Sequence, residues 1–150
     1  MSTVVVAVGD ADVRAVVRMV VDLRGHTVRE VATCADAAEV LLASAEPCVV
    51  LLDSYLGGDR EGYAAALRLL ELAHAGGLYR HAFILLSADG TTRLPAALQL
   101  LRGVLSVPVV PMPFDIDELL NEVERARWRL LPQVLVDAGR VAALSVASCN

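Results

Sequence analysis

The chain contains no lysine, because all 13 of its basic residues are arginine. This absence excludes a lysine Schiff base, a lysine general base and a lysine side chain that binds phosphate. Cysteine is scarce as well, and the three cysteines form no CxxC pair. They are expected to be thiols in a reducing compartment rather than a disulfide framework. The three histidines lie far apart in the sequence, so they do not predict a metal site.

Long apolar runs and basic clusters are also missing. The apolar stretches are shorter than a membrane span, and no positively charged segment precedes the first of them, so we expect neither a membrane helix nor a signal peptide, and a cytoplasmic location. A formal net charge of −5 without a basic cluster argues against nucleic-acid binding. With 56% hydrophobic residues in 150, the chain is predicted to form one compact domain.

Short apolar segments alternate with amphipathic ones over residues 1–131. The apolar segments predict five strands, at residues 4–8, 27–32, 48–53, 81–88 and 107–113. The first predicted helix has Val13, Val16, Val17 and Val20 on its apolar face and is expected to end at Gly25. Further helices are predicted over residues 34–44, 61–75 and 91–102, and from Asp115 or Asp117 to Leu131. Thr33 followed by Asp36 indicates a capping box at the start of the second helix. Residues 132–150 lie outside the pattern, as a C-terminal tail of uncertain structure.

This alternation predicts an α/β fold in which helices cover both faces of a parallel sheet. In such sheets ligands bind beyond the carboxyl ends of the strands. Asp53 ends the third predicted strand, Ser87 ends the fourth and Met112 ends the fifth. Gly9 and Asp10 follow the first strand, so we expect these five residues to meet at one edge of the sheet.

The order of elements and these edge residues resemble the receiver domain of bacterial two-component response regulators, over about residues 4 to 130. The resemblance rests on "VVLLD" ending in Asp53, "LLSA" placing Ser87, and "MPF" at residues 112–114. It implies a flavodoxin-like, doubly wound sheet in the strand order 2-1-3-4-5. It also implies a role in signal transduction or transcriptional regulation, as part of a phosphorelay, rather than an enzyme.

In that family the aspartate at the position of Asp53 accepts a phosphoryl group from a histidine kinase. A serine or threonine at the position of Ser87 responds to the bound phosphoryl group. A Lys-Pro pair after the fifth strand supplies a cation and a cis peptide. Pro113 and Phe114 match this last motif, but Met112 stands where the lysine is expected. Two acidic residues hold magnesium in the family.

The positions at which the family has its acidic pair are occupied here by Val8 and Gly9. Asp10 falls on one of these two positions only if the alignment with the family is shifted by one residue. Asp10 and Asp53 are therefore weak candidates for a magnesium site. A charge-assisted hydrogen bond to a phosphoryl oxygen contributes about 1.5–3 kcal/mol, which Met112 does not supply. The sequence favours an atypical receiver, a pseudo-receiver, whose Asp53 is not phosphorylated and which works through protein–protein contact.

Two other functions stay open. One is a receiver that is phosphorylated on Asp53 with magnesium held by Asp10 and Asp53. The other is a receiver-fold module whose pocket, lined by Val8, Gly9, Ser87 and Met112, binds a small molecule. The edge residues also have structural interpretations: Asp10 would stabilise a helix start, Ser87 would bond a nearby backbone group, and Met112 would pack in the interior.

Exposed apolar side chains are expected on two helices. In the helix over 91–102, Leu94, Ala97, Leu98 and Leu101 form an inward stripe, and Leu100 lies off it. In the last helix Trp128 projects to one side of the apolar face. We expect a homodimer or partner complex through the fourth helix, fifth strand and fifth helix that buries Leu100 or Trp128. Alternatively, the tail covers Trp128.

Overall fold

The computed structural model describes residues 2–57, 62–90 and 93–131. Its strands are β1 (Thr3–Ala7), β2 (Thr27–Val31), β3 (Val49–Asp53), β4 (Ala82–Ser87) and β5 (Val109–Pro111). They form one sheet in the order β2-β1-β3-β4-β5, and every pairing is parallel. This arrangement confirms the predicted fold class and strand order.

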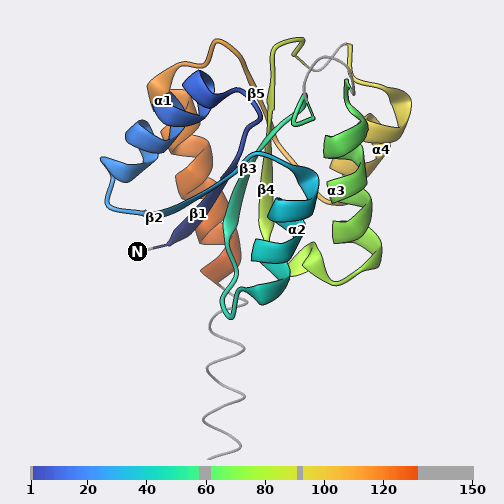
Figure 1. Cartoon of the computed structure of the whole chain (residues 1–150), viewed down its shortest axis with the longest axis horizontal. Coiled ribbons are helices and arrows are strands. Elements are labelled where there is room, and N and C mark those ends of the chain that lie inside the picture. The colour runs from blue at the N-terminus through green and yellow to red at the C-terminus, as the bar shows by residue number, and fades with distance from the viewer. Residues whose placement is uncertain (1, 58–61, 91–92, 132–150) are drawn as a thin grey trace, which may run out of the picture.

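Helices lie on both faces of the sheet (Figure 1). They are α1 (Ala11–Asp22), α2 (Cys34–Ala43), α3 (Ala64–Ala75), α4 (Ala96–Val104) and a helix over residues 116–131, here named the C-terminal helix. A 3₁₀ turn, η1 (Leu78–Arg80), precedes β4. Side chains of α1 and the C-terminal helix share one apolar cluster, and those of α2, α3 and α4 share the other. No helix in the described ranges is long and apolar enough to cross a membrane.

The central strands supply both apolar clusters because alternate side chains point to opposite faces. Val5 and Val50 belong to the cluster under α2 and α3, whereas Val4 and Leu51 belong to the cluster under α1. All four side chains are completely buried. Burying one such side chain contributes about 1.5–3 kcal/mol, so this double-sided core holds the sheet in register.

Local side-chain contacts decide where several helices begin. The Thr33 Oγ1 accepts a hydrogen bond from the Asp36 N–H at 3.1 Å, which confirms the predicted cap. Asp115, not Asp117, opens the C-terminal helix, since its Oδ1 accepts from the Asp117 and Glu118 N–H groups at 2.8 and 3.2 Å.

Two elements differ most from their predicted bounds. The helix expected to begin at residue 91 begins at Ala96, directly after Pro95. A proline disfavours helical backbone in the residue before it, so Leu94 stays outside the helix. β5 is only three residues long. Pro108 and Pro111 lack the N–H that would extend its pairing with β4.

Two residues predicted to face inward lie at the surface. Val16 of α1 is 47% exposed, because the buried line of that helix runs through Val17, Val20 and Val21. Ala97 of α4 is exposed as well, and Leu98 is its fully buried neighbour. The other residues assigned to these inward faces do face the interior: Val17 and Val20 of α1 are buried, Leu98 of α4 is fully buried, and Leu101 packs against the apolar cluster under α2 and α3.

His81 connects three elements at the start of β4. Its Nδ1 accepts a hydrogen bond from the Cys48 N–H at 2.9 Å, and its Nε2 lies 3.0 Å from the Leu41 carbonyl oxygen. A neutral ring with its proton on Nε2 satisfies both contacts. Burial, together with the positive charge of Arg80, lowers the pKa of His81 to about 4, against the opposing effect of the Leu41 contact.

We therefore expect the stability of the protein to fall between pH 6.5 and pH 4 partly through His81. An unfolded histidine binds its proton near pH 6.5 and the folded one only near pH 4, so acid favours the unfolded state. The free energy of unfolding should decrease by about 2 kcal/mol over this range from His81 alone. Urea unfolding at several pH values measures the slope. His81→Asn should flatten it, whereas His74→Asn, at an exposed position, should not; equal slopes in all three proteins would contradict this role.

Candidate functional site

Asp53 lies at the carboxyl edge of the sheet, where the sequence placed it. It is in register with Leu86 of β4, one residue before Ser87. The side chain is 7% exposed, and its Oδ1 accepts a hydrogen bond from the Tyr55 N–H at 3.0 Å. Burial raises the pKa of the Asp53 carboxyl; the hydrogen bond from Tyr55 opposes this shift, and the negative charge of Asp10 adds to it. The fold therefore brings Asp53 and Asp10 close enough to interact.

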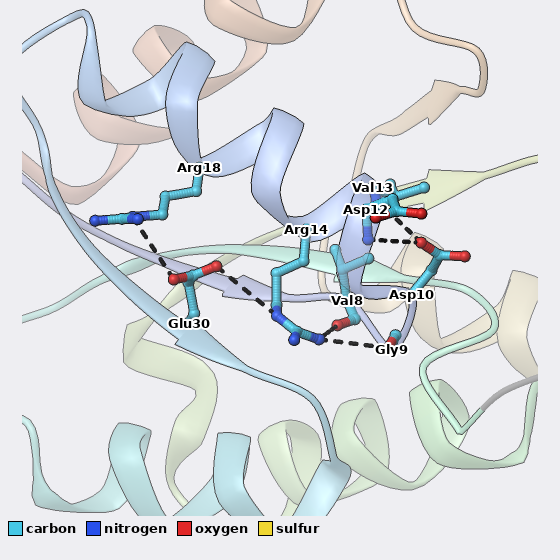
Figure 2. A network of polar contacts seen from close by, with 8 residues as sticks. All are labelled: Val8, Gly9, Asp10, Asp12, Val13, Arg14, Arg18 and Glu30. Carbon is cyan, nitrogen blue, oxygen red and sulfur yellow. Dashed lines mark hydrogen bonds and ion pairs between the residues drawn. The ribbon is translucent and has the colours of Figure 1, made fainter.

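Asp10 caps helix α1. Its Oδ1 accepts hydrogen bonds from the N–H groups of Asp12 and Val13 at 2.9 and 3.0 Å (Figure 2). These are N–H groups of the first turn that have no partner within the helix. The structural interpretation of Asp10 is thus correct, and one of its two oxygens is already used.

Val8 and Gly9 occupy the positions expected for the acidic pair, and an arginine side chain binds their backbone carbonyl oxygens. The Arg14 guanidinium donates to the Val8 carbonyl oxygen at 2.8 Å and to that of Gly9 at 3.3 Å (Figure 2). The Arg14 Nε also lies 3.8 Å from Glu30 of β2. The Val8 side chain is completely buried in the apolar cluster under α1. An acidic side chain at Val8 would therefore be buried without a partner.

Gly9 has no space for a side chain. A Cβ atom built on it would lie 2.5 Å from the Leu56 carbonyl oxygen and 3.4 Å from the Leu56 carbonyl carbon. Leu56 is fixed in turn, because its side chain is 1% exposed and its N–H donates to the Asp53 carbonyl oxygen at 3.1 Å. The loop after β3 thus occupies the space in which a second magnesium-binding carboxylate would have to lie.

Ser87 and Met112 are both engaged in the fold. The Ser87 side chain is completely buried, and its Oγ accepts a hydrogen bond from the Asp89 N–H at 3.3 Å. The Met112 N–H donates to the Ser87 carbonyl oxygen at 2.9 Å. Met112 and Phe114 pack against the apolar cluster under α1, and the Met112–Pro113 peptide bond is cis. The structural interpretations of Ser87 and Met112 are therefore confirmed.

A cluster of two tyrosines and an aspartate joins the loops after β3 and β4. The Tyr55 and Tyr63 hydroxyls both donate to Asp89 Oδ2, the first at 2.7 Å. The two rings lie 4.7 Å apart between centroids. The hydrogen bond from Tyr63 lowers the pKa of the Asp89 carboxyl, and burial with the Asp89 contact raises the pKa of Tyr63. Asp89 is therefore charged at neutral pH, next to Ser87.

Sequence reasoning missed this cluster because its members are far apart along the chain. Tyr55 and Tyr63 are eight residues apart, and Tyr55 and Asp89 are 34 residues apart. Only the pairing of β3 with β4 brings them together. A weak signal exists, since only 4% of the residues are aromatic, and two of the three tyrosines lie between β3 and α3.

The donor set near Asp53 suits a magnesium ion poorly. Mg²⁺ usually binds one or two carboxylates and several waters besides a phosphate ligand. Asp10 and Asp53 provide two carboxylates, and the Oδ1 of each already accepts backbone hydrogen bonds. Within the described ranges, no group of three or more His, Cys, Asp or Glu residues is placed to hold a metal. The pair meets only the minimum for this ion.

A cavity of about 410 Å³ lies at the same edge, but not where the sequence predicted a ligand pocket. Its lining residues are Gly9, Ala32, Thr33, Cys34, Ala35, Leu56, Gly57, Ala65 and Arg68. Gly9 is the only residue it shares with the predicted pocket; Val8 and Ser87 are completely buried. The four residues proposed to line a small-molecule pocket thus do not enclose this cavity.

The side chains predicted to mediate association are exposed. Leu100 of α4 is 69% exposed, and Val104, one turn further, is 57% exposed. Trp128 of the C-terminal helix is 64% exposed. The tail predicted as an alternative cover for Trp128, residues 132–150, lies outside the described residues.

Comparison with solved structures places this fold among receiver domains. The response regulator StyR superimposes with a TM-score of 0.75 at 17% sequence identity, over 97% of this chain and 69% of that one. A CheY-like receiver domain protein from Methanospirillum hungatei JF-1 gives 0.66 at 21% identity, over 81% of this chain and 90% of that one. The receiver domain of the Francisella response regulator 1452 gives 0.68 at 18% identity, over 86% and 98%.

The sequence itself matches no protein-family model and no curated protein. The likeness is therefore one of three-dimensional structure. The chain has the CheY-like fold of response regulator receiver domains, as predicted from the resemblance of its edge residues.

Proposed function

We propose that this chain is a signalling domain with the receiver fold that acts through protein–protein contact and not through phosphoryl transfer to Asp53. The observation that carries the proposal is the contact between Gly9 and Leu56. A Cβ atom at Gly9 would meet the Leu56 carbonyl oxygen at 2.5 Å, which supports the proposal because the second expected acidic position then has no room for a carboxylate.

The other groups around Asp53 support the same conclusion. The Ser87 Oγ is buried and accepts from the Asp89 N–H, and the half-buried Met112 packs against the apolar cluster under α1 and presents no cation. Arg14 is engaged with two carbonyl oxygens on the side of the sheet next to β2. A phosphoryl group on Asp53 would add negative charge near Asp10 and Asp89. Because phosphoryl transfer depends on positioned positive charge, this environment should slow it severely.

The exposed apolar residues support a function in association. Leu100 and Val104 share one side of α4, since they are four residues apart, and both are more than half exposed. α4 and the C-terminal helix flank β5 in the sequence and pack on opposite faces of the sheet. Large apolar side chains exposed together commonly mark protein-binding surfaces. The surface formed by α4, β5 and the C-terminal helix is therefore the proposed contact surface.

Asp53 is expected to stay unmodified when the protein is incubated with magnesium and acetyl phosphate. Intact-mass measurement, with Asp53→Asn as control and an ordinary receiver domain as a positive standard, tests this. A phosphoryl adduct in the wild type that is absent from Asp53→Asn would overturn the proposal in favour of a phosphorylated receiver.

Asp53→Asn is a suitable control because it should fold well. The pKa of the buried Asp53 carboxyl is raised in the folded protein, so its charged form opposes folding at pH 7. The amide oxygen of asparagine can still accept from the Tyr55 N–H. The thermal midpoint of Asp53→Asn at pH 7 should equal or exceed that of the wild type.

A further inference from the structure

The outer side of α1 carries a line of exposed apolar side chains, here named the α1 stripe. Val16 is 47% exposed, Met19 is 58% exposed, and Leu23, directly after the helix, is 79% exposed. Spacings of three and four residues place these side chains next to one another along one side of the helix. Single exposed apolar residues are ordinary, but a group of large ones commonly marks a surface that another segment covers.

The α1 stripe lies on the flank of α1 that is turned away from β2. Arg14 and Arg18 occupy the other flank, where their Nε atoms lie 3.8 and 3.6 Å from Glu30 of β2 (Figure 2). Because successive residues of a helix are rotated by about 100°, the centre of the stripe is about 150° around the helix from these arginines. The stripe is therefore on the side of the C-terminal helix, which covers the same face of the sheet as α1 (Figure 1).

The chain leaves the C-terminal helix close to one end of the α1 stripe. Arg24, which follows Leu23, and Arg127 of the C-terminal helix line the same pocket, so the last turns of the two helices are neighbours. Leu131 is one turn beyond Arg127. Pro132 follows, and proline is unfavourable for continuing the same helix. The C-terminal tail, residues 132–150, thus starts near the Leu23 end of the stripe.

The sequence of the tail suits an apolar surface. Of its 19 residues 11 are hydrophobic, and only two, Asp137 and Arg140, are charged. Even as a helix, 19 residues span about 28 Å, whereas the 12 residues of α1 span about 18 Å. The tail is therefore long enough to extend along the whole α1 stripe.

Tethering favours the tail over a second copy of the chain as the segment that covers the stripe. A segment joined by a short connection to the surface it binds is present there at an effective concentration of the order of millimolar. A second copy at micromolar concentration competes poorly with it. The exposed Leu100 of α4 is a less accessible alternative for the tail, because α4 packs on the opposite face of the sheet.

We propose that residues 132–150 dock on the α1 stripe of the same molecule and cover Val16, Met19 and Leu23. This proposal goes beyond the contact function proposed above and does not depend on it. It removes α1 from the surfaces open to a partner and leaves the surface formed by α4, β5 and the C-terminal helix.

Oxidation of Met19 by dilute hydrogen peroxide tests the proposal in the full chain. Peroxide converts an accessible methionine to its sulfoxide, and peptide mass mapping gives the rate at each methionine separately. Leu42→Met supplies an internal standard, because Leu42 of α2 is 66% exposed, close to the 58% of Met19. Met19 should be oxidised about tenfold more slowly than the introduced methionine, as for a tail docked about nine tenths of the time. The ratio should be the same at low and high micromolar protein concentration.

Substitutions in the tail, made in the Leu42→Met background, show whether the tail causes the protection. Val141→Asp combined with Leu144→Asp adds two charges to the apolar part of the tail and should raise the oxidation rate of Met19 to that of the standard. Gln133→Asp, at a position that is already polar, should leave Met19 protected.

Three results would overturn the proposal. The first is a Met19 that is oxidised as fast as the standard although the tail is unchanged. The second is protection that increases with protein concentration, which would mean that a second copy covers the stripe. The third is protection that persists when both Val141→Asp and Leu144→Asp are present.

Discussion

Gly9→Asp, the change that would bring back an acidic residue of ordinary receivers, is expected to destabilise the protein by about 3 kcal/mol or more. It is not expected to create a magnesium site. The reason is the Leu56 carbonyl oxygen, which would lie 2.5 Å from the new Cβ atom. Typical domains have only about 5–15 kcal/mol of stability, so the loss should be measured easily by urea unfolding.

The neighbouring loop cannot move away at low cost. The Leu56 side chain belongs to the apolar cluster under α2 and α3, and the N–H groups of Leu56 and Tyr55 both donate to Asp53. Moving Leu56 would disturb these contacts together. In Gly9→Asp the carboxylate would also approach a carbonyl oxygen, which repels it. Gly9→Ala, without the charge, should cost about 2 kcal/mol.

Gly103 provides the matched control for a glycine replacement. It lies in α4, and a Cβ atom built on it would meet nothing within 4 Å. Gly103→Ala should therefore be stabilising by about 0.5–1 kcal/mol, since alanine is the better helix former. If Gly9→Ala unfolds at the same urea concentration as the wild type, then Gly9 does have space for a side chain and this explanation is wrong. If Gly9→Asp gains magnesium-dependent phosphorylation of Asp53, the proposed function is wrong as well.

The second large effect is expected on self-association. Leu100→Glu should weaken a homodimer about 1000-fold, because a symmetric interface loses the leucine and gains the charge once in each subunit. Losing one leucine contact from each subunit accounts for about 1.5–3 kcal/mol per side. Sedimentation velocity over a range of micromolar concentrations should show a dimer for the wild type and a monomer for Leu100→Glu. Trp128→Ala should act in the same direction.

Two further surface variants make this experiment selective. Leu42 of α2 is 66% exposed, nearly the same as Leu100 at 69%, but it lies outside the proposed contact surface. Leu42→Glu should leave the dimer intact. Met19 of α1 and Leu23, directly after that helix, are 58% and 79% exposed and form a competing apolar stripe with Val16. If Met19→Glu dissociates the dimer and Leu100→Glu does not, association uses α1 instead.

The general architecture could be predicted because the sequence patterns reflect local forces. Buried strands of a parallel sheet are apolar on both faces, so β3 and β4 are continuous apolar runs that end at the polar residues Asp53 and Ser87, and β1 is apolar from Val4 to Ala7. Thr33 was recognisable as a cap because its partner, Asp36, lies only three residues away. Asp53 was recognisable because a carboxylate directly follows four buried apolar residues.

The details of the site depended on contacts between distant segments. That Gly9 lies against Leu56 follows from the pairing of β1 with β3, and nothing near Gly9 in the sequence indicates it. The same holds for Arg14, which fits the helical pattern equally well as a solvated charge but binds two carbonyl oxygens (Figure 2). Val16 and Ala97 were assigned to the inward faces of α1 and α4 because apolar side chains extend around most of each helix, so the pattern alone does not fix the limits of the buried face.

The two edges of the sheet also bear on how copies of this protein can meet. β5 is short, and Pro108 and Pro111 offer no N–H to an approaching strand. β2, at the other edge, exposes Arg29 and Glu30. Short, proline-containing or charged edges resist the addition of strands from a second molecule, which is the first step toward fibrous aggregates. At high concentration this protein should therefore form assemblies of limited size through its helices, instead of growing by extension of the sheet.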